Sequence, residues 1–354
     1  MENFVGCYSV IVKEGAISMH MADALVAPAV AGTLYVFSTM AAAYSVKKVE
    51  AEDEPKKIPL MGVMGAFVFS AQMINFTIPG TGASGHLCGG MLLTALLGPY
   101  EAFLTMIGVL LIQCLMFADG GFLALGCNIW NMAFYGCFVG YFLIWHPVVR
   151  HGFSKAKIIG ASILGSVVAL QLGAFSVTLE TMFSGITELP FLVFVSTMQP
   201  IHLAIGFIEG LITAMVLLFV YEARPQMLQG IEETTSTYIE SKCSIRKVIT
   251  VFGIITLFTG GIFSLFASVY PDGLEWSIER ISGSSEIETV NNHIYIILEN
   301  IQKATAILAD YGFKGTESVF GTSFSGIIGS LAVLGICLIA CFAFRYIRRK
   351  KKTI

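Results

Sequence analysis

The chain has 354 residues, of which 55% are hydrophobic and 13% charged, and its net charge is −3. Its mean hydropathy of +0.77 is typical of a helical protein that crosses the membrane several times. The sequence has no Lys/Arg-rich stripe with interleaved aromatic residues, which excludes nucleic-acid binding, and its eight cysteines form no CxxC pair, which excludes a disulfide framework or zinc knuckle.

The first 18 residues differ from the rest of the chain. A secretory signal would place Lys or Arg ahead of an apolar stretch, whereas this leader has Glu2 near its start and Lys13-Glu14 in its middle. We therefore expect residues 1–18 to be a non-native leader, from an upstream start codon or removed later. Met19 is then the mature N-terminus.

Nine apolar runs follow the leader, and a helix needs roughly 20 residues to cross a bilayer core. The predicted spans are residues 25–46, 58–76, 87–97, 101–118, 127–146, 156–177, 200–221, 247–269 and 322–345. The run at 87–97 is short, either because it begins below the surface or because a neighbouring loop dips in beside it. The predicted fold is an all-α, polytopic helical membrane protein.

A polar stretch at residues 224–246 separates seven spans from two and is typical of a linker. We predict a seven-span metal-binding bundle over residues 19–223 and an accessory unit over 247–346, with a basic cytoplasmic tail at 347–354. The accessory unit is a two-span hairpin with an extracytoplasmic loop, which carries eight acidic and three basic residues. That loop either concentrates cations near the mouth of the bundle or is simply solvated.

Lys and Arg residues set the orientation. Four segments, 47–57, 150–157, 224–247 and 345–352, hold 17 of the 21 basic residues. Nine spans place all four on one side, which the positive-inside rule makes cytoplasmic. The Met19 end and the loop at 77–86 then face outward, and the C-terminus is cytoplasmic.

Two histidines on the outer side suggest a metal site. His20 directly follows Met19, so the terminal amine, the His20 amide and the His20 imidazole would form a three-nitrogen chelate, which His86 could complete. Nitrogen donors favour Ni2+, Co2+ and Cu2+ over Mg2+ and Ca2+. The alternatives are that His20 is an ordinary surface residue before a helix and that His86 belongs to a tight glycine-rich turn.

Several polar residues are candidates for a supporting or translocating role. They are Asp23, Asn75, Asn128, Asn131, His202 and Glu209. Asp23 could accept the His20 N–H or favour the first turn of the next helix. His202 and Glu209 lie seven residues apart, on one helical face, and could relay a cation or hydrogen-bond between helices.

Two other function classes remain open from the residues alone. Gly82-Ala83-Ser84-Gly85 matches the GxSG pattern of intramembrane serine proteases, with Ser84 as nucleophile and His202 as a conceivable base. An ion-driven secondary transporter using Glu209 is the other. The chain has no P-loop, so it cannot supply its own ATP hydrolysis, and we interpret it as a transporter component rather than an enzyme.

Four passages resemble a known family, the CbiM/NikM substrate-capture components of cobalt and nickel energy-coupling-factor transporters, and a fifth resembles the small accessory subunit. They are residues 19–25 (MHMADAL), 80–90 (GTGASGHLCGG), 128–134 (NIWNMAF), 199–206 (QPIHLAIG) and, in the accessory unit, Pro271-Asp272-Gly273-Leu274-Glu275. The last resembles the PDGLE domain of the small CbiN/NikN-like subunit, so the chain resembles a fusion of the two. Where the family commonly has His-Ile-Pro-Asp-Gly, this chain has His20-Met21-Ala22-Asp23-Ala24.

The resemblance implies a seven-span fold whose N-terminus enters the bundle and binds metal through Met19, His20 and His86. It also implies ATP-driven uptake of Co2+ or Ni2+ across the cell membrane. The implied partners are a transmembrane coupling component, two cytoplasmic ATPase subunits and membrane lipid. The ion is cargo, and no permanently bound cofactor is expected.

Overall fold

The computed structural model describes residues 20–52, 57–230, 242–284, 292–313 and 319–352. Its elements are η1 (Asp23–Leu25), α1 (Pro28–Glu52), α2 (Lys57–Gln72), β1 (Phe76–Ile78), β2 (Ala83–Gly85), α3 (Gly90–Leu97), α4 (Pro99–Phe117), α5 (Leu125–Asn128), η2 (Ile129–Trp145), α6 (His146–Val149), α7 (Lys155–Ser184), α8 (Phe191–Ala223), η3 (Pro225–Met227), α9 (Ile245–Gly261), η5 (Phe263–Phe266), α10 (Gly273–Ser282), α11 (His293–Thr305), η6 (Ala309–Tyr311) and α12 (Val319–Lys352). Helices α5, η2 and α6 form one continuous rod, of which η2 is π-helical.

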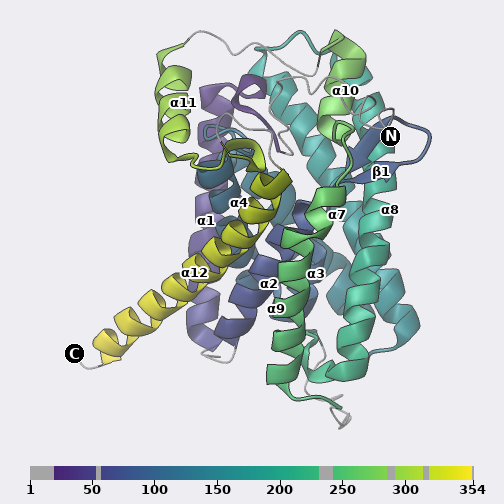
Figure 1. Cartoon of the computed structure of the whole chain (residues 1–354), viewed down its shortest axis with the longest axis vertical. Coiled ribbons are helices and arrows are strands. Elements are labelled where there is room, and N and C mark those ends of the chain that lie inside the picture. The colour runs from purple at the N-terminus through teal and green to yellow at the C-terminus, as the bar shows by residue number, and fades with distance from the viewer. Residues whose placement is uncertain (1–19, 53–56, 231–241, 285–291, 314–318, 353–354) are drawn as a thin grey trace, which may run out of the picture.

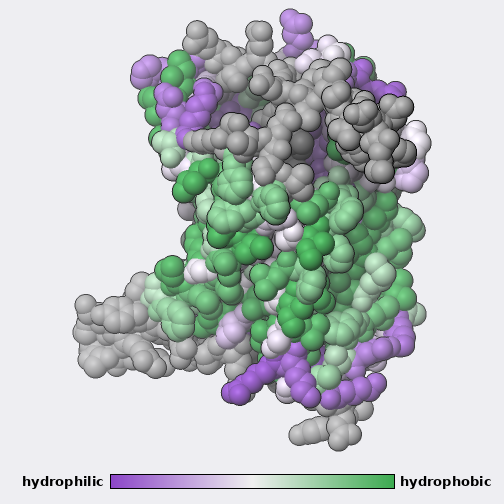
Figure 2. Space-filling view, in the orientation of Figure 1, coloured by the Kyte–Doolittle hydropathy of each residue, from purple (hydrophilic) through white to green (hydrophobic). Residues whose placement is uncertain are grey.

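Most of the long helices form an upright bundle, α12 slopes outward from it, and α10 and α11 lie on opposite sides of one end (Figure 1). Within the described residues, six helices are long and apolar enough to span a membrane: α1, α4, the α5–α6 rod, α7, α8 and α12. A hydrophobic belt covers the middle of the face seen in Figure 2, and polar side chains gather at both ends. The chain is therefore an all-α polytopic membrane protein, as predicted.

The short span is helix α3, which starts late because the chain enters the bundle in an extended form. The backbone N–H groups of Cys88 and Gly89 donate to the carboxylate of Glu209, at 2.8 and 3.1 Å, instead of to a preceding turn. Helix α3 begins only at Gly90, where an added Cβ would lie 3.0 Å from the Gly136 backbone. The predicted run at 87–97 is therefore helical only from Gly90 to Leu97.

Helix α8 differs most from the sequence prediction, because it begins at Phe191 rather than at residue 200. Pro190 occupies the N-cap, and Pro200 lies inside the helix. The hydroxyls of Ser196 and Thr197 donate back to carbonyls one turn earlier, so these two polar residues continue the helix. Polar residues before Pro200 therefore do not mark a loop.

The predicted outer loops also contain regular structure. Residues 76–85 form a small antiparallel hairpin in which Phe76 pairs with Gly85 and Ile78 with Ala83. The long acidic segment of the accessory unit holds α10, α11 and the turn η6. Both lie at the end of the bundle that we call the α10 end (Figure 1).

The accessory hairpin packs against α2 through small residues. Gly260 of α9 and Gly326 of α12 touch backbone to backbone, so a Cβ on Gly326 would overlap the Gly260 carbonyl. The Ser70 and Ser330 hydroxyls hydrogen-bond at 2.6 Å between α2 and α12. Small residues let the helix axes approach closely, which is how helices associate without a hydrophobic driving force in lipid.

We expect Gly326→Ala to destabilise the protein by about 1–3 kcal/mol, because the added methyl group overpacks the α9–α12 crossing. Gly335→Ala, in the same helix, is the matched control, since nothing lies within 4 Å of its Cβ position. Thermal unfolding of both variants in the same detergent measures the difference. Equal melting temperatures would contradict this account of the crossing.

Candidate metal site

The chain from residue 20 to residue 27, here called the strap, lies inside the α10 end of the bundle. The Met21 N–H donates to Asn128 Oδ1 at 3.0 Å, and Asn128 Nδ2 donates back to the Met21 carbonyl at 3.1 Å. The Gly121 N–H also donates to the Met21 carbonyl, and the Tyr295 hydroxyl donates to the Val26 carbonyl at 2.8 Å. These bonds provide hydrogen-bond partners for N–H and carbonyl groups of the strap that no regular helix or sheet pairs.

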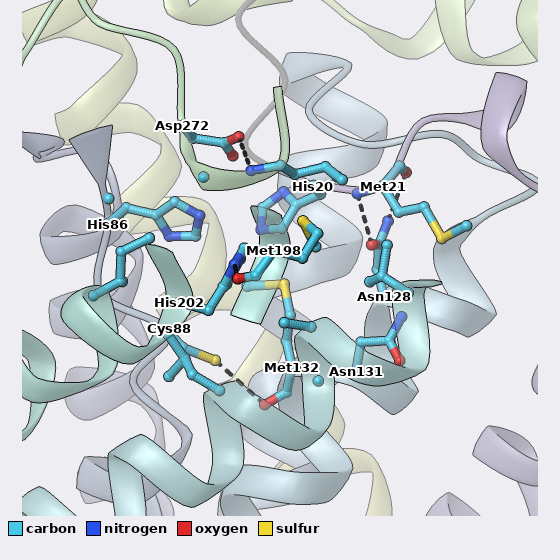
Figure 3. A pocket seen from close by; sticks show the side chains of 18 of the residues that line it. His20, Met21, His86, Cys88, Asn128, Asn131, Met132, Met198, His202 and Asp272 are labelled. Atoms are coloured by element: carbon cyan, nitrogen blue, oxygen red, sulfur yellow. Dashed lines mark hydrogen bonds between the residues drawn. The ribbon is translucent and has the colours of Figure 1, made fainter. Parts of the chain in front are cut away.

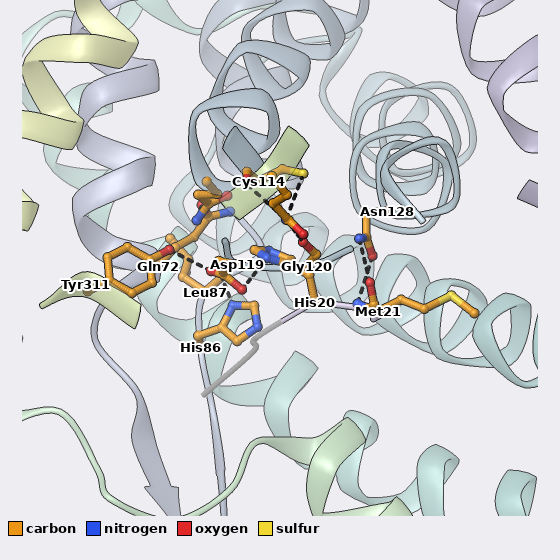
Figure 4. Close-up of polar contacts among 12 residues, drawn as sticks. His20, Met21, Gln72, His86, Leu87, Cys114, Asp119, Gly120, Asn128 and Tyr311 are labelled. Carbon is orange, nitrogen blue, oxygen red and sulfur yellow. Dashed lines mark hydrogen bonds and ion pairs between the residues drawn. The ribbon is translucent and has the colours of Figure 1, made fainter. Parts of the chain in front are cut away.

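His20 is buried beside an acidic group that the sequence did not single out. Its Nδ1 lies 2.9 Å from Asp119 Oδ1, and the Tyr311 hydroxyl donates to Asp119 Oδ2 at 2.6 Å (Figure 4). Burial alone would lower the pKa of His20, but the Asp119 carboxylate outweighs it and raises that pKa above its usual value. Burial would raise the pKa of Asp119, yet His20 and then Tyr311 lower it overall.

The loop that holds Asp119 needs its two glycines. A Cβ on Gly120 would lie 2.7 Å from the His20 Cβ, and one on Gly121 would overlap the Asp23 carboxylate. Gly120 also has a φ of +78°, in the left-handed region that favours glycine. The pair Gly120-Gly121 therefore lets the strap and the Asp119 loop touch.

His86 follows strand β2 and faces His20. The two imidazole rings lie edge to face, with centroids 5.8 Å apart. The His86 Nδ1 donates to the Leu87 carbonyl at 3.2 Å, which leaves Nε2 to accept. The Glu209 carboxylate accepts from the N–H groups of Cys88 and Gly89, so α8 holds the His86 loop in place.

Both histidines line a cavity of about 100 Å3 between the strap, the β hairpin and helices η2, α7, α8 and α10 (Figure 3). The other lining side chains that carry a nitrogen, oxygen or sulfur atom are Met21, Cys88, Asn128, Asn131, Met132, Met198, His202 and Asp272. His202 donates from Nδ1 to the Met198 carbonyl at 2.8 Å. Three imidazoles, from the strap, the β2 end and α8, thus share one cavity.

Asp272 brings the accessory unit into this cavity. It is the N-cap of α10, and its Oδ1 accepts from the N–H groups of Leu274 and Glu275 at 2.9 and 2.8 Å. Burial raises the pKa of Asp272, against opposing effects of His86, of the capped N–H groups and of His20. The aspartate of the PDGLE sequence is therefore both a helix cap and a wall of the cavity.

The described residues contain no group of three His, Cys, Asp or Glu side chains placed to hold a metal ion on their own. Met19, the predicted source of the terminal nitrogen, lies outside the described residues, as does the leader.

The predicted supporting residues have different places. Asn128 holds the strap, and the Asn131 Nδ2 donates to Glu180 Oε2 at 2.9 Å from the cavity wall. Asn75 is not a cavity residue; its carbonyl accepts from the Ser268 N–H, between the bundle and the accessory unit. Of the two roles considered for Asp23, the structure shows the place in the first turn of a helix, η1. Its Oδ1 accepts from the Ala124 N–H at 2.9 Å, and Asp119 lies beside the His20 imidazole instead.

The groups required by the two rival functions are engaged in structural bonds. Ser84 is fully buried in β2, and its hydroxyl donates to the Tyr270 carbonyl at 2.8 Å rather than to His202. The Glu209 carboxylate accepts the two N–H groups named above. Each therefore has a role in holding the fold at the α10 end.

Asp119 and Tyr311 were not among the site residues predicted from the sequence, and Asp272 was named only as part of the PDGLE motif. Asp119 lies in a four-residue turn, Ala118 to Gly121, and the Asp-Gly-Gly sequence was its only local signal. Tyr311 is one of several aromatic residues in an outer segment, and nothing in its neighbourhood marks it. Only the fold brings these residues together.

Comparisons with known proteins agree on one family. A family model described as the cobalt uptake substrate-specific transmembrane region, CbiM, matches residues 20–227, and a PDGLE domain model matches residues 246–346. A protein of Archaeoglobus fulgidus that carries the name fused nickel transport protein NikMN is 32% identical over 318 residues, 90% of this chain and 96% of its own length. The cobalt transport protein CbiM of Sorangium cellulosum is 32% identical over 186 residues, 49% of this chain and 77% of its own length.

A solved structure is similar as well. The crystal structure of a truncated transition metal transporter shares 29% sequence identity and a TM-score of 0.51, and the match covers 57% of this chain and 98% of that one. The resemblance expected from the sequence passages is confirmed. Because the matched residues make up more than half of its length, the chain belongs to the CbiM family of cobalt uptake substrate-specific transmembrane regions and carries a PDGLE domain behind it.

Proposed function

We propose that this chain captures Co2+ or Ni2+ from outside the cell membrane and is the substrate-specific component of an ATP-driven uptake transporter. The observation that carries the proposal is the set of three imidazoles and one buried carboxylate around a single cavity at the α10 end. Imidazole nitrogen suits cobalt and nickel, whereas Mg2+ and Ca2+ require oxygen ligands. The cobalt and nickel transport names of the relatives support the same cargo.

The ligand set of the proposal is the Met19 amine, the His20 amide and imidazole, and the His86 imidazole. The strap supports it, because Asn128 and Gly121 bond the backbone of Met21 and so fix the residue that follows His20. The described side chains do not complete a site alone, which fits a chelate that draws on the main chain. His202 and Asp272 then stand beside the ion.

The proposal also includes the source of energy for uptake and the orientation of the chain in the membrane. The chain has no P-loop, so hydrolysis would come from two cytoplasmic ATPase subunits through a transmembrane coupling component. The positive-inside rule favours the α10 end as the outside, since Lys47 and Lys48 of α1, Lys57 of α2 and Arg150 after α6 lie toward the opposite end. The cavity would then receive its ion from outside.

We expect His20→Ala and His86→Ala each to abolish uptake of Ni2+ or Co2+ while the protein still inserts in the membrane. Uptake is measured in cells that also produce the coupling and ATPase subunits, and in cells without them, where wild-type uptake should stop. His151→Ala, in an exposed turn at the other end of the bundle, is the matched control. Undiminished uptake in both cavity variants would refute the site.

The terminal amine gives a second prediction. Protein that starts at Met19 should bind one equivalent of Ni2+, and protein that keeps residues 1–18 should bind it far more weakly, because an amide cannot replace the free amine. Isothermal titration measures both affinities, and mass spectrometry of uptake-active molecules identifies their first residue. Active molecules with the leader intact would contradict the chelate.

The effect of the Asp272 charge on metal binding can be separated from its effect as a helix cap. Asparagine caps helices as well as aspartate does, so Asp272→Asn should leave the melting temperature nearly unchanged. Loss of a buried negative charge next to a divalent ion should weaken Ni2+ binding at least ~10-fold, since unit charges 4 Å apart interact by about 4 kcal/mol at an effective dielectric constant of 20. Wild-type affinity in this variant would assign Asp272 to the fold alone.

A further inference from the structure

Helix α11 carries a stripe of exposed isoleucines. Ile294, Ile297 and Ile301 are 44, 45 and 42% exposed. Because an α-helix has about 3.6 residues per turn, their spacing places them on one side of it. The bundle-facing side is a different one, where Tyr295 is buried and Gln302 half-buried. The stripe is therefore not the core-facing side of α11, and it is too apolar for a side that faces water.

The third side of α11 is polar. Glu299 and Lys303 are both exposed and form an ion pair at 2.6 Å across one helical turn. Asn300 is exposed beside them, and Ile296 shares this side. The helix therefore has one side toward the protein, one polar side and one apolar side. That division is typical of a helix at the boundary between water and lipid.

Contacts with α4 give the depth at which α11 lies. Gln302 Nε2 donates to the Cys114 carbonyl at 3.1 Å, and the Leu308 N–H donates to the Met116 carbonyl at 3.1 Å. Cys114 and Met116 belong to the last turn of α4, a helix long and apolar enough to span the membrane. Ile307, between these two contacts, is 69% exposed. The C-terminal half of α11 and the residues after it therefore lie at the level where α4 leaves the hydrocarbon.

The figures show where the stripe lies relative to the hydrophobic belt. Helix α11 stands at the edge of the α10 end, with its C-terminal end toward the middle of the molecule (Figure 1). At the same edge in Figure 2, hydrophobic side chains continue from α11 toward the belt. The exposed apolar surface of α11 is thus continuous with the surface that faces lipid.

We propose that the isoleucine stripe of α11, with Ile307 beyond it, inserts into the boundary between headgroups and acyl chains in the leaflet at the α10 end. Lipid is the occupant because the stripe lies at the depth of the last turn of α4 and continues the belt. Interfacial helices bury their apolar side by about 5–10 Å at this boundary. The Glu299–Lys303 pair stays on the side toward water and headgroups.

Lipid contact on one side of α11 supports the strap on the other side. The Tyr295 hydroxyl donates to the Val26 carbonyl of the strap at 2.8 Å. Gln302 donates to the Gly120 carbonyl at 2.7 Å, in the loop that carries Asp119. The bilayer therefore holds the helix that holds the strap. Insertion of the stripe is independent of which ion the chain carries.

Tryptophan reporters test the insertion in full-length protein in nanodiscs. The lipid is phosphatidylcholine whose acyl chains carry bromine, a quencher of tryptophan emission, near their carbonyl end, and unbrominated lipid is the reference. Ile297→Trp and Ile301→Trp should each lose most of the emission that they add to the wild-type signal. Ile296→Trp is the matched control and should lose little, because Ile296 is also 45% exposed but lies about 100° away around the helix.

Iodide in the water distinguishes the other possible occupants of the stripe. Emission from positions 297 and 301 that iodide quenches and bromine does not would place the stripe in water. Emission that neither quenches would place a second copy of the chain over it. Either result, or equal quenching by bromine at positions 296 and 297, would overturn the proposal.

Hydrogen exchange of the strap measures the support that lipid gives. In the same nanodiscs without bromine, Ile297→Gln/Ile301→Gln should make the strap amides exchange about 10-fold faster or more, because an isoleucine that loses an apolar environment loses at least that factor. Ile296→Gln should leave the exchange at the wild-type rate. A wild-type rate in the double variant would overturn the link between lipid and the strap.

Discussion

The structure of the α10 end depends on the two hydrogen bonds between the Asn128 side chain and the backbone of Met21. The strap enters an apolar bundle without strand partners, and each buried, unpaired N–H or carbonyl would cost roughly 1–3 kcal/mol. The Asn128 amide supplies both a donor and an acceptor at the spacing of a backbone peptide, so it pairs with Met21 as a residue of a neighbouring β-strand would. His20 and its neighbours can be buried because these two hydrogen bonds form.

The two units of the chain are structurally interdependent. The accessory hairpin lies on α2 through the glycine and serine contacts, and its outer segment covers the strap through Tyr295, Tyr311 and Asp272. The bundle supplies the histidines, and the PDGLE domain supplies a carboxylate of the cavity wall and the hydroxyl behind Asp119. The cavity at the α10 end is therefore lined by both parts of one polypeptide.

Much of this could be predicted from the sequence, because a membrane constrains the pattern of apolar runs so strongly. The all-α class follows from hydropathy, and Lys/Arg placement puts both histidines at the same end of the bundle, where the structure shows them in one cavity. The start of α8 was wrong because Ser196 and Thr197 bond their own helix, which a polar pattern does not reveal. Asp119, Tyr311 and Asp272 were missed as partners because they lie about 100, 290 and 250 residues from His20, and such distances carry no local signal.

Covalent linkage of the two units has a consequence for gene expression. The accessory unit contributes Asp272 to the cavity wall and the Tyr311 hydroxyl to Asp119. Each bundle therefore requires one accessory unit. Two separate polypeptides would have to be synthesised in balance and find one another in the bilayer, whereas a tether raises the effective local concentration to about the millimolar range. Every ribosome that finishes this message therefore delivers both halves in equal number, and no surplus of either half needs to be degraded.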